Sequence, residues 1–200
     1  LIRSVSVAPG GEEAAFAELP AGDKVIEIWL SQEIPVALTA LQGDAPCRPV
    51  KDPRPRWVTY GSSLTHCMRA HSPARTWPAT VARRRGLNLT SLGFGGQCAL
   101  DAMVGMTIAD LPAEFITLKL GINTIGGALS ARTYPAAVVG LVQIIRYKQP
   151  DTPIALVSPI GYPPHETIPN AVGYTIEGMR RDMADVHRRL VSLGDTNLIY

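Results

Sequence analysis

The stretch Trp57-Val-Thr-Tyr-Gly-Ser-Ser-Leu-Thr65 places a short apolar strand pattern directly before a turn with one glycine and two serines. Aromatic and β-branched residues favour a strand over residues 57–60, and Gly61 ends it. The same order, an apolar run followed by a glycine-containing or polar turn, recurs further along the chain. The later runs are Leu87–Leu92, Phe115–Leu120 and Pro153–Ser158. Each of these runs predicts a strand that ends in a turn.

Helical patterns separate the predicted strands. Thr76 is a suitable N-terminal cap, Pro78 fits a first helical turn, and Gly86 is a C-terminal stop. Further helices are predicted over residues 99–109, 134–147 and 173–193, and a last strand begins at residue 198. The alternation of strand and helix predicts an α/β fold, in which right-handed crossovers build a parallel sheet with helices on both faces.

Residues 1–50 have a different pattern. Short strand-like runs at residues 24–30 and 35–41 are bounded by turn residues, which favours the C-terminal part of a β-sandwich module. The proline-rich stretch Pro49–Arg56 is then a stiff connector. The sequence therefore predicts two units, a β-sandwich piece over 1–50 and an α/β domain over 57–200, with a linker between them.

Composition and charge exclude several classes of function. The 200 residues carry 19 Lys and Arg against 17 Asp and Glu, a net charge of +2, which provides no strongly basic surface for nucleic acid. The longest uncharged apolar run, residues 136–145, is too short to span a bilayer. The 3 cysteines form no Cys-x-x-Cys pair, so no metal site is expected, and their low number favours a cytoplasmic over a secreted location.

Small and polar residues follow the predicted strands: Ser63 after the first, Gly96 after the second and Asn123 after the third. Because the carboxyl ends of parallel strands meet at the ligand-binding edge of a sheet, we expect these residues to lie close together. A serine hydroxyl becomes a nucleophile once a base removes its proton. The Gly96 amide, the Asn123 side chain and the amide of Ser63 itself can donate to the oxyanion that forms, so the combination favours acyl transfer.

Each of these residues alone has an ordinary structural explanation. A Gly-Ser-Ser turn is typical of a helix cap, and an isolated Asn123 is typical of a turn. The loop Gly93-Phe-Gly-Gly96 has neither the Gly-x-Gly-x-x-Gly spacing nor the Gly-Lys-Ser/Thr of a phosphate-binding loop, so no nucleotide cofactor is expected. The three residues at successive strand ends are therefore stronger evidence than any one of them.

Three stretches resemble the first three sequence blocks of the SGNH hydrolases, also called GDSL esterases and lipases. They are Trp57–Thr65, Leu92-Gly-Phe-Gly-Gly-Gln97 and Leu118-Lys-Leu-Gly-Ile-Asn123. The resemblance covers residues 56–200 and implies a flavodoxin-like, three-layer α/β/α fold. It implies that Ser63 is the nucleophile and that Gly96 and Asn123 are the oxyanion-hole donors. The strand-rich start is similar to the amino-terminal β-sandwich of some bacterial members.

The chain departs from the family pattern at two points. The Gly-Asp-Ser of the family is Gly61-Ser62-Ser63 here, a variant that keeps the nucleophile. The family's base is the histidine of a C-terminal Asp-x-x-His block, which these 200 residues do not contain. We expect that block after Tyr200, so that residues 57–200 are an SGNH domain truncated before it. The histidines that are present are the alternative bases: His66, His71, His165 and His187.

These observations predict a serine esterase or acylhydrolase that cleaves a small-molecule carboxylic ester, an acylated sugar being one candidate. Two alternatives stay open. An acyltransferase would use the same Ser63 to pass the acyl group to an alcohol. The missing base is also compatible with a catalytically silent protein that binds a carbohydrate or another ligand. No cofactor, nucleic acid or membrane span is expected.

Overall fold

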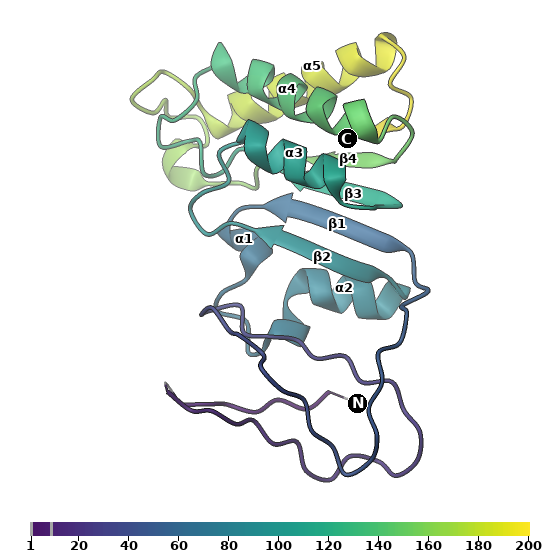
Figure 1. The fold of residues 1–200 in the computed structure, drawn as a ribbon. Helices are drawn as coiled ribbons and strands as arrows, with labels where there is room; N and C mark the ends of the chain where they lie inside the picture. The colour runs from purple at the N-terminus through teal and green to yellow at the C-terminus, as the bar shows by residue number, and fades with distance from the viewer. Residues whose placement is uncertain (1, 9) are drawn as a thin grey trace.

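The computed structural model describes residues 2–8 and 10–200, whose arrangement is shown in Figure 1. In this part of the chain, five strands form one parallel sheet in the order β2-β1-β3-β4-β5. The strands are β1 (Arg56–Gly61), β2 (Asn88–Gly93), β3 (Phe115–Lys119), β4 (Ile154–Val157) and β5 (Leu198–Ile199). The parallel α/β architecture predicted from the sequence is confirmed.

Helices lie on both faces of the sheet. They are α1 (Ser63–His66), α2 (Trp77–Arg85), α3 (Ala102–Asp110), α4 (Thr133–Lys148) and α5 (Ile176–Ser192), with short 3₁₀ turns η1 (Pro73–Arg75) and η2 (Pro163–His165). In Figure 1, α3, α4 and α5 pack beside one another on one side, while α1 and α2 lie along β2 on the other. The chain therefore has the three layers and the strand order of a flavodoxin-like fold.

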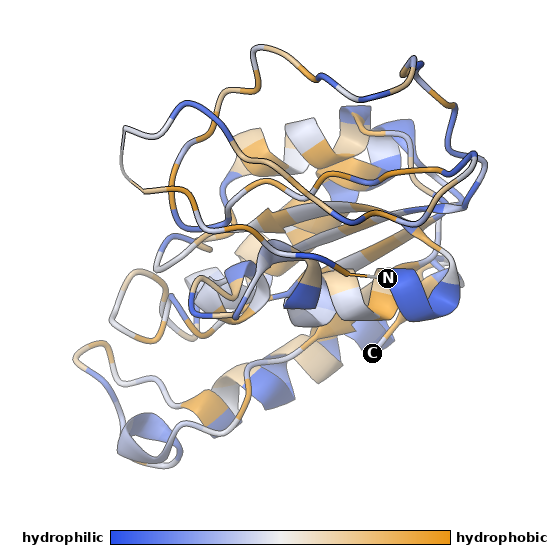
Figure 2. Ribbon diagram, turned by 90° about the horizontal axis from the view of Figure 1, so that it is seen from below, coloured by the Kyte–Doolittle hydropathy of each residue, from blue (hydrophilic) through white to orange (hydrophobic). Residues whose placement is uncertain are grey.

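Alternate strand residues build the main core. Val58 and Tyr60 of β1 pair with Ile116 and Leu118 of β3, and all four are buried in the cluster that includes α3, α4 and α5. Burying an aliphatic side chain such as Ile116 stabilises the fold by about 1.5–3 kcal/mol. Figure 2 shows the strands largely in the orange of apolar residues. The apolar runs seen in the sequence are thus the strands of the core, as expected for a sheet covered by helices.

The opposite face of the sheet is covered less evenly. Trp57 of β1 packs against Trp77 of α2, with 6.0 Å between the ring centroids. Toward β5, the same face carries Phe115, Val157 and Ile199, each at least 36% exposed. The layer formed by α1 and α2 therefore covers the part of the sheet that contains β1 and β2.

The segment before β1 differs from the prediction. Residues 2–8 and 10–55 contain no strand or helix, so the strands expected over 24–30 and 35–41 are not formed. An alternating pattern makes a strand only when a neighbouring strand shares its backbone hydrogen bonds, and the described chain offers this segment no such neighbour. Figure 1 shows the segment as open loops beyond α2. Its assignment to a β-sandwich module remains a prediction.

A buried ion pair joins α4 to the turn before β5. Arg146 donates from Nε and Nη2 to the two carboxylate oxygens of Asp195, both at 2.9 Å. Its Nη1 donates to the carbonyl oxygens of Gln149 and Thr152. Only 10% of the Arg146 side chain and 12% of the Asp195 side chain are exposed. Loss of one partner would leave the other charge buried without compensation.

We expect Arg146→Ala to lower the free energy of unfolding by about 3–5 kcal/mol, because Asp195 would lose its partner in a buried place. Chemical denaturation followed by circular dichroism measures the change. Lys148→Ala is the control, since the Lys148–Asp110 pair is 53% and 61% exposed and such pairs contribute about 0–1 kcal/mol. An equal loss of unfolding free energy in the two variants would show that the buried Arg146–Asp195 pair stabilises the fold no more than the exposed pair does.

Candidate active site

Ser63 lies where β1 passes into α1. Ser62 is fully buried and caps the helix, because its Oγ accepts a hydrogen bond from the Leu64 amide at 3.3 Å. Ser63 follows as the first helical residue and is exposed. The serine that stands in place of the family's aspartate therefore keeps an oxygen at the cap position, where Asp and Ser are equally suitable. The neighbouring Ser63 remains accessible to a substrate.

Two glycines allow the turns after β1 and β2 to approach closely. A Cβ atom on Gly93 would overlap the backbone of His66 in α1 and would stand 2.8 Å from the carbonyl carbon of Thr65. A Cβ atom on Gly61 would stand 3.2 Å from the carbonyl oxygen of Lys119 in β3. The approach at Gly93 leaves no room for a Cβ atom unless the backbone moves, and a Cβ atom on Gly61 would also overlap Oγ1 of the Thr65 side chain in α1. Glycine at both positions therefore lets α1 pack directly on the ends of its neighbouring strands.

Hydrogen bonds connect the three turns. The Phe94 amide donates to the Gly61 carbonyl oxygen at 2.8 Å, which joins the turn after β2 to the end of β1. The Cys98 amide donates to Asn123 Oδ1 at 3.0 Å, which joins the turn after β2 to the turn after β3. Gly96, with φ +74°, lies between these two contacts, and a Cβ atom on it would face open space. The turns that carry Ser63, Gly96 and Asn123 are thus linked in series.

The Cys98–Asn123 bond has a chemical consequence. It occupies the carbonyl oxygen of the Asn123 side chain and thereby fixes which end of the carboxamide carries the N–H₂ group. Within residues 2–8 and 10–200, no hydrogen bond uses Asn123 Nδ2. A fixed amide donor is therefore left at the edge where the strands end. This contact has no signal in the amino-acid sequence, since the donor is a backbone amide that any residue could supply.

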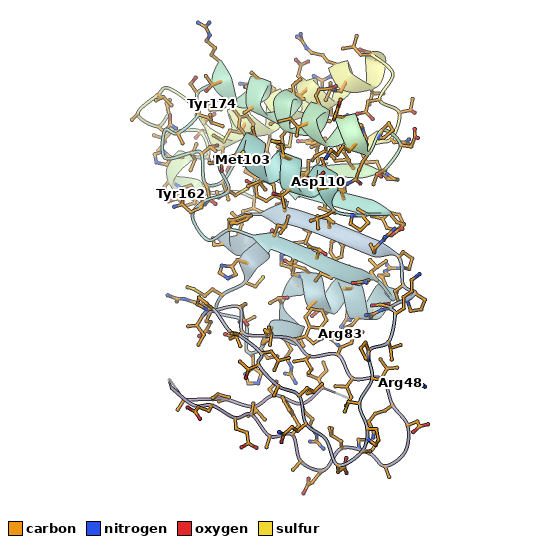
Figure 3. The ribbon with its side chains drawn as sticks, in the orientation of Figure 1. Arg48, Arg83, Met103, Asp110, Tyr162 and Tyr174 are labelled. Atoms are coloured by element: carbon orange, nitrogen blue, oxygen red, sulfur yellow. The ribbon has the colours of Figure 1, made fainter. Side chains whose placement is uncertain are left out.

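An open cavity of about 510 Å³ adjoins Ser63. Its walls come from the segments 67–70 and 75–77, which connect α1 to α2. The loop after β4 reaches the same edge of the molecule, where Figure 3 shows Tyr162, whereas Asp110 at the end of α3 lies toward the opposite edge. The site is therefore a hollow beside the serine and not a closed pocket.

Three of the four histidines contact backbone carbonyl oxygens away from Ser63. His66 Nε2 contacts the carbonyl oxygen of Gln32, His187 Nε2 contacts that of Leu198 at 3.1 Å, and His165 Nδ1 contacts that of Ile168 at 3.3 Å. His71 is exposed in the loop after α1. In the part of the chain that the structure describes, no hydrogen bond connects a histidine to Ser63. The identity of the base therefore stays a prediction.

The groups behind the site are neutral at physiological pH. Burial raises the pKa of the Cys98 thiol to about 11, although the neighbouring Tyr60 hydroxyl opposes part of this shift. Burial also raises the pKa values of the Tyr60 and Tyr134 hydroxyls. Among the described residues, no group of three His, Cys, Asp or Glu side chains is arranged to hold a metal ion, and no helix is long and apolar enough to cross a membrane.

Residues 55–200 match the model of a protein family described as the GDSL-like lipase/acylhydrolase family. The chain belongs to this family. The SGNH resemblance of the sequence is thereby confirmed, and the five-stranded sheet is the fold of the GDSL-like domain. No curated protein matches the chain.

Solved structures of three similar proteins share this fold. The salicylyl-acyltransferase SsfX3 from a tetracycline biosynthetic pathway is 38% identical, with a TM-score of 0.68 over 74% of this chain and 42% of that one. A putative GDSL-like lipase from Bacteroides ovatus is 24% identical, with a TM-score of 0.61 over 75% and 43%. AlinE4, an SGNH-hydrolase family esterase, is 17% identical, with a TM-score of 0.52 over 75% and 77%. The chain spans less than half of the length of the first two.

Gly93→Ala is expected to lower the free energy of unfolding of the GDSL-like domain by about 1–3 kcal/mol or more, because the new methyl group would meet the backbone of α1. Thermal unfolding monitored by calorimetry gives the shift in melting temperature. Gly126→Ala is the matched control, since a Cβ atom there meets nothing within 4 Å. A melting temperature for Gly93→Ala equal to that of the control would show that the close approach is not required.

The raised pKa of Cys98 predicts a loss of stability at high pH. Between the ordinary thiol pKa of 9.0 and the folded value of about 11, the unfolded chain has lost the proton and the folded chain has kept it. The free energy of unfolding should therefore fall as pH rises from 9.0 to about 11, by an amount on the order of 2 kcal/mol. In Cys98→Ala, the free energy of unfolding measured with urea should fall less steeply over this pH range, because the thiol is gone while the buried tyrosines are still present. Identical slopes would contradict the burial of this thiol.

Proposed function

We propose that this chain supplies the nucleophile and the oxyanion donors of a serine-dependent enzyme that cleaves carboxylic esters. The observation that supports this most directly is the hydrogen bond from the Cys98 amide to Asn123 Oδ1, which leaves an N–H donor on a turn that is linked through the turn after β2 to the turn of the exposed Ser63. Membership of the GDSL-like lipase/acylhydrolase family supports the same class of reaction.

In the proposed reaction, Ser63 Oγ attacks the ester carbonyl carbon while a base accepts its proton. The carbonyl π electrons move to oxygen, and the tetrahedral intermediate collapses as the alcohol leaves with a proton returned by the base. Water then hydrolyses the acyl-serine by the same steps. The base is proposed to be the histidine of the family's Asp-x-x-His block, which these 200 residues do not contain.

The oxyanion of the intermediate needs donors that are already in position before the reaction. We assign this role to the Gly96 amide, Asn123 Nδ2 and the amide of Ser63. Gly96 has no side chain to obstruct the approach of a substrate, and a Cβ atom on it would face open space. Donors that do not reorganise stabilise the transition state strongly, and loss of one typically slows an enzyme by about 100- to 1000-fold.

Acyl transfer to an alcohol acceptor is the second candidate, because the chain is 38% identical to a salicylyl-acyltransferase. The first steps are the same, and an acceptor hydroxyl replaces water in the attack on the acyl-serine. Analysis of products formed with a 4-nitrophenyl ester and an added alcohol separates the two. A new ester indicates transfer, and free acid alone supports hydrolysis. An acylated sugar as the natural ester remains a proposal.

Ser63→Ala should abolish covalent labelling by a fluorophosphonate and turnover of 4-nitrophenyl acetate in the full-length protein, since no other hydroxyl is assigned as nucleophile. Mass spectrometry of the labelled peptide gives the position. Ser91→Ala, at an exposed position of β2, is the matched control and should label as the parent does. Turnover that survives in Ser63→Ala would indicate another nucleophile, and absence of both labelling and turnover in the parent would favour the catalytically silent alternative.

Asn123→Asp tests the roles of the oxygen and the nitrogen of the carboxamide separately. The variant keeps an oxygen for the Cys98 amide but removes the N–H donor, so the domain should fold while kcat falls by about 100- to 1000-fold. Steady-state kinetics and circular dichroism give the two readouts. A kcat within about threefold of the parent would exclude Asn123 as an oxyanion donor.

A further inference from the structure

The hollow beside Ser63 has an unusual chemical composition. Two arginines, Arg69 and Arg75, line it, whereas none of the residues that line it is an Asp or a Glu. The remaining wall is largely apolar, with contributions from Met68 and Trp77. The hollow therefore combines positive charge with an apolar surface next to the proposed nucleophile.

The charges in the hollow are not neutralised by the protein. The ion pairs formed within residues 2–8 and 10–200 include neither Arg69 nor Arg75. Arg83 of α2 behaves differently, since it donates from Nε and Nη2 to the carbonyl oxygen of Ala74 and thereby stabilises the turn before its own helix. The guanidinium groups at 69 and 75 remain available to a ligand.

Contacts from distant parts of the chain hold the walls in place. Gln32 Nε2 donates to the carbonyl oxygens of Met68 and Ala70, both at 3.1 Å, so the segment before β1 anchors the loop that carries Arg69. On the other wall, Trp77 Nε1 donates to the carbonyl oxygen of Leu64 in α1 at 2.7 Å. One wall is thus tied to the segment before β1 and the other to α1.

We propose that this hollow binds an anionic group of the ester substrate, a carboxylate or a phosphate carried on an apolar body. The inference rests on the proposed function and names the class of substrate. A guanidinium group donates two parallel N–H bonds to a carboxylate or phosphate, and two such groups can grip one anion. Met68 and Trp77 would cover the apolar body, and the position of the hollow would bring the ester toward Ser63.

Binding of small probes tests the inference in the full-length protein. Isothermal titration calorimetry compares benzoate, phenyl phosphate and the neutral analogue benzyl alcohol. At low salt, we expect at least one of the anions to bind about tenfold more tightly than benzyl alcohol, and this advantage to shrink as salt is added. The two anions separate a carboxylate site from a phosphate site.

Variants assign the effect to the two arginines. The double variant Arg69→Ala/Arg75→Ala should lose the preference for the anion, whereas Arg69→Lys/Arg75→Lys should keep part of it, which excludes a folding defect as the cause. Arg84→Ala is the matched control, because Arg84 is an exposed arginine of α2 outside the hollow. Equal binding of anions and benzyl alcohol, or an equal loss in Arg84→Ala, would overturn the proposal.

The outcomes distinguish this inference from the function on which it rests. If anions bind in a manner that depends on Arg69 and Arg75, but fluorophosphonate does not label Ser63, the proposed anion site is supported and the proposed esterase activity is contradicted. If fluorophosphonate labels Ser63, but anions bind no more tightly than benzyl alcohol, the proposed esterase activity is supported and the proposed anion site is contradicted. Because none of the three probes is a carboxylic ester, the binding result does not depend on turnover.

Discussion

The close approach of α1 to the ends of β1 and β2 is the constraint on which the rest of the site depends. Gly93 has no Cβ atom to separate its strand from the backbone of His66, and Gly61 has none to separate β1 from α1 and β3. Ser63 can therefore begin a helix at the point where the sheet ends. The turns after β2 and β3 then join to it through Phe94 and through the Cys98–Asn123 bond. A bulkier residue at either glycine would separate these turns and with them the groups assigned to catalysis.

Most of the fold could be predicted because its signals are local. The apolar runs around Val58 and Ile116 are core strands in the structure, and the turn residues between them mark the helix ends. The strands predicted over 24–30 and 35–41 are not formed in the described chain, for a physical reason. The alternation of apolar and polar residues is a local property, whereas a strand requires a partner, and the described chain gives this segment none.

The site could be predicted only where side chains carry the chemistry. Ser63 and Asn123 are visible in the sequence because a hydroxyl and a carboxamide have recognisable uses at strand ends. The contact of the Cys98 amide with Asn123 could not be predicted, since it depends on how the turns after β2 and β3 pack together and not on the residue type at position 98. Gln32 could not be predicted either, because its contacts with Met68 and Ala70 join residues that lie 36 and 38 positions apart. The Gln32 contacts tie one wall of the hollow to the segment before β1, which a local pattern does not describe.

A crystal structure of the phosphonate adduct of the full-length protein would show whether Ser63, Gly96 and Asn123 act on one substrate carbonyl, as we propose. We expect phosphorus bonded to Ser63 Oγ, with one phosphonyl oxygen about 2.7–3.1 Å from both the Gly96 amide and Asn123 Nδ2. An adduct on another residue, or a phosphonyl oxygen directed away from both donors, would contradict it.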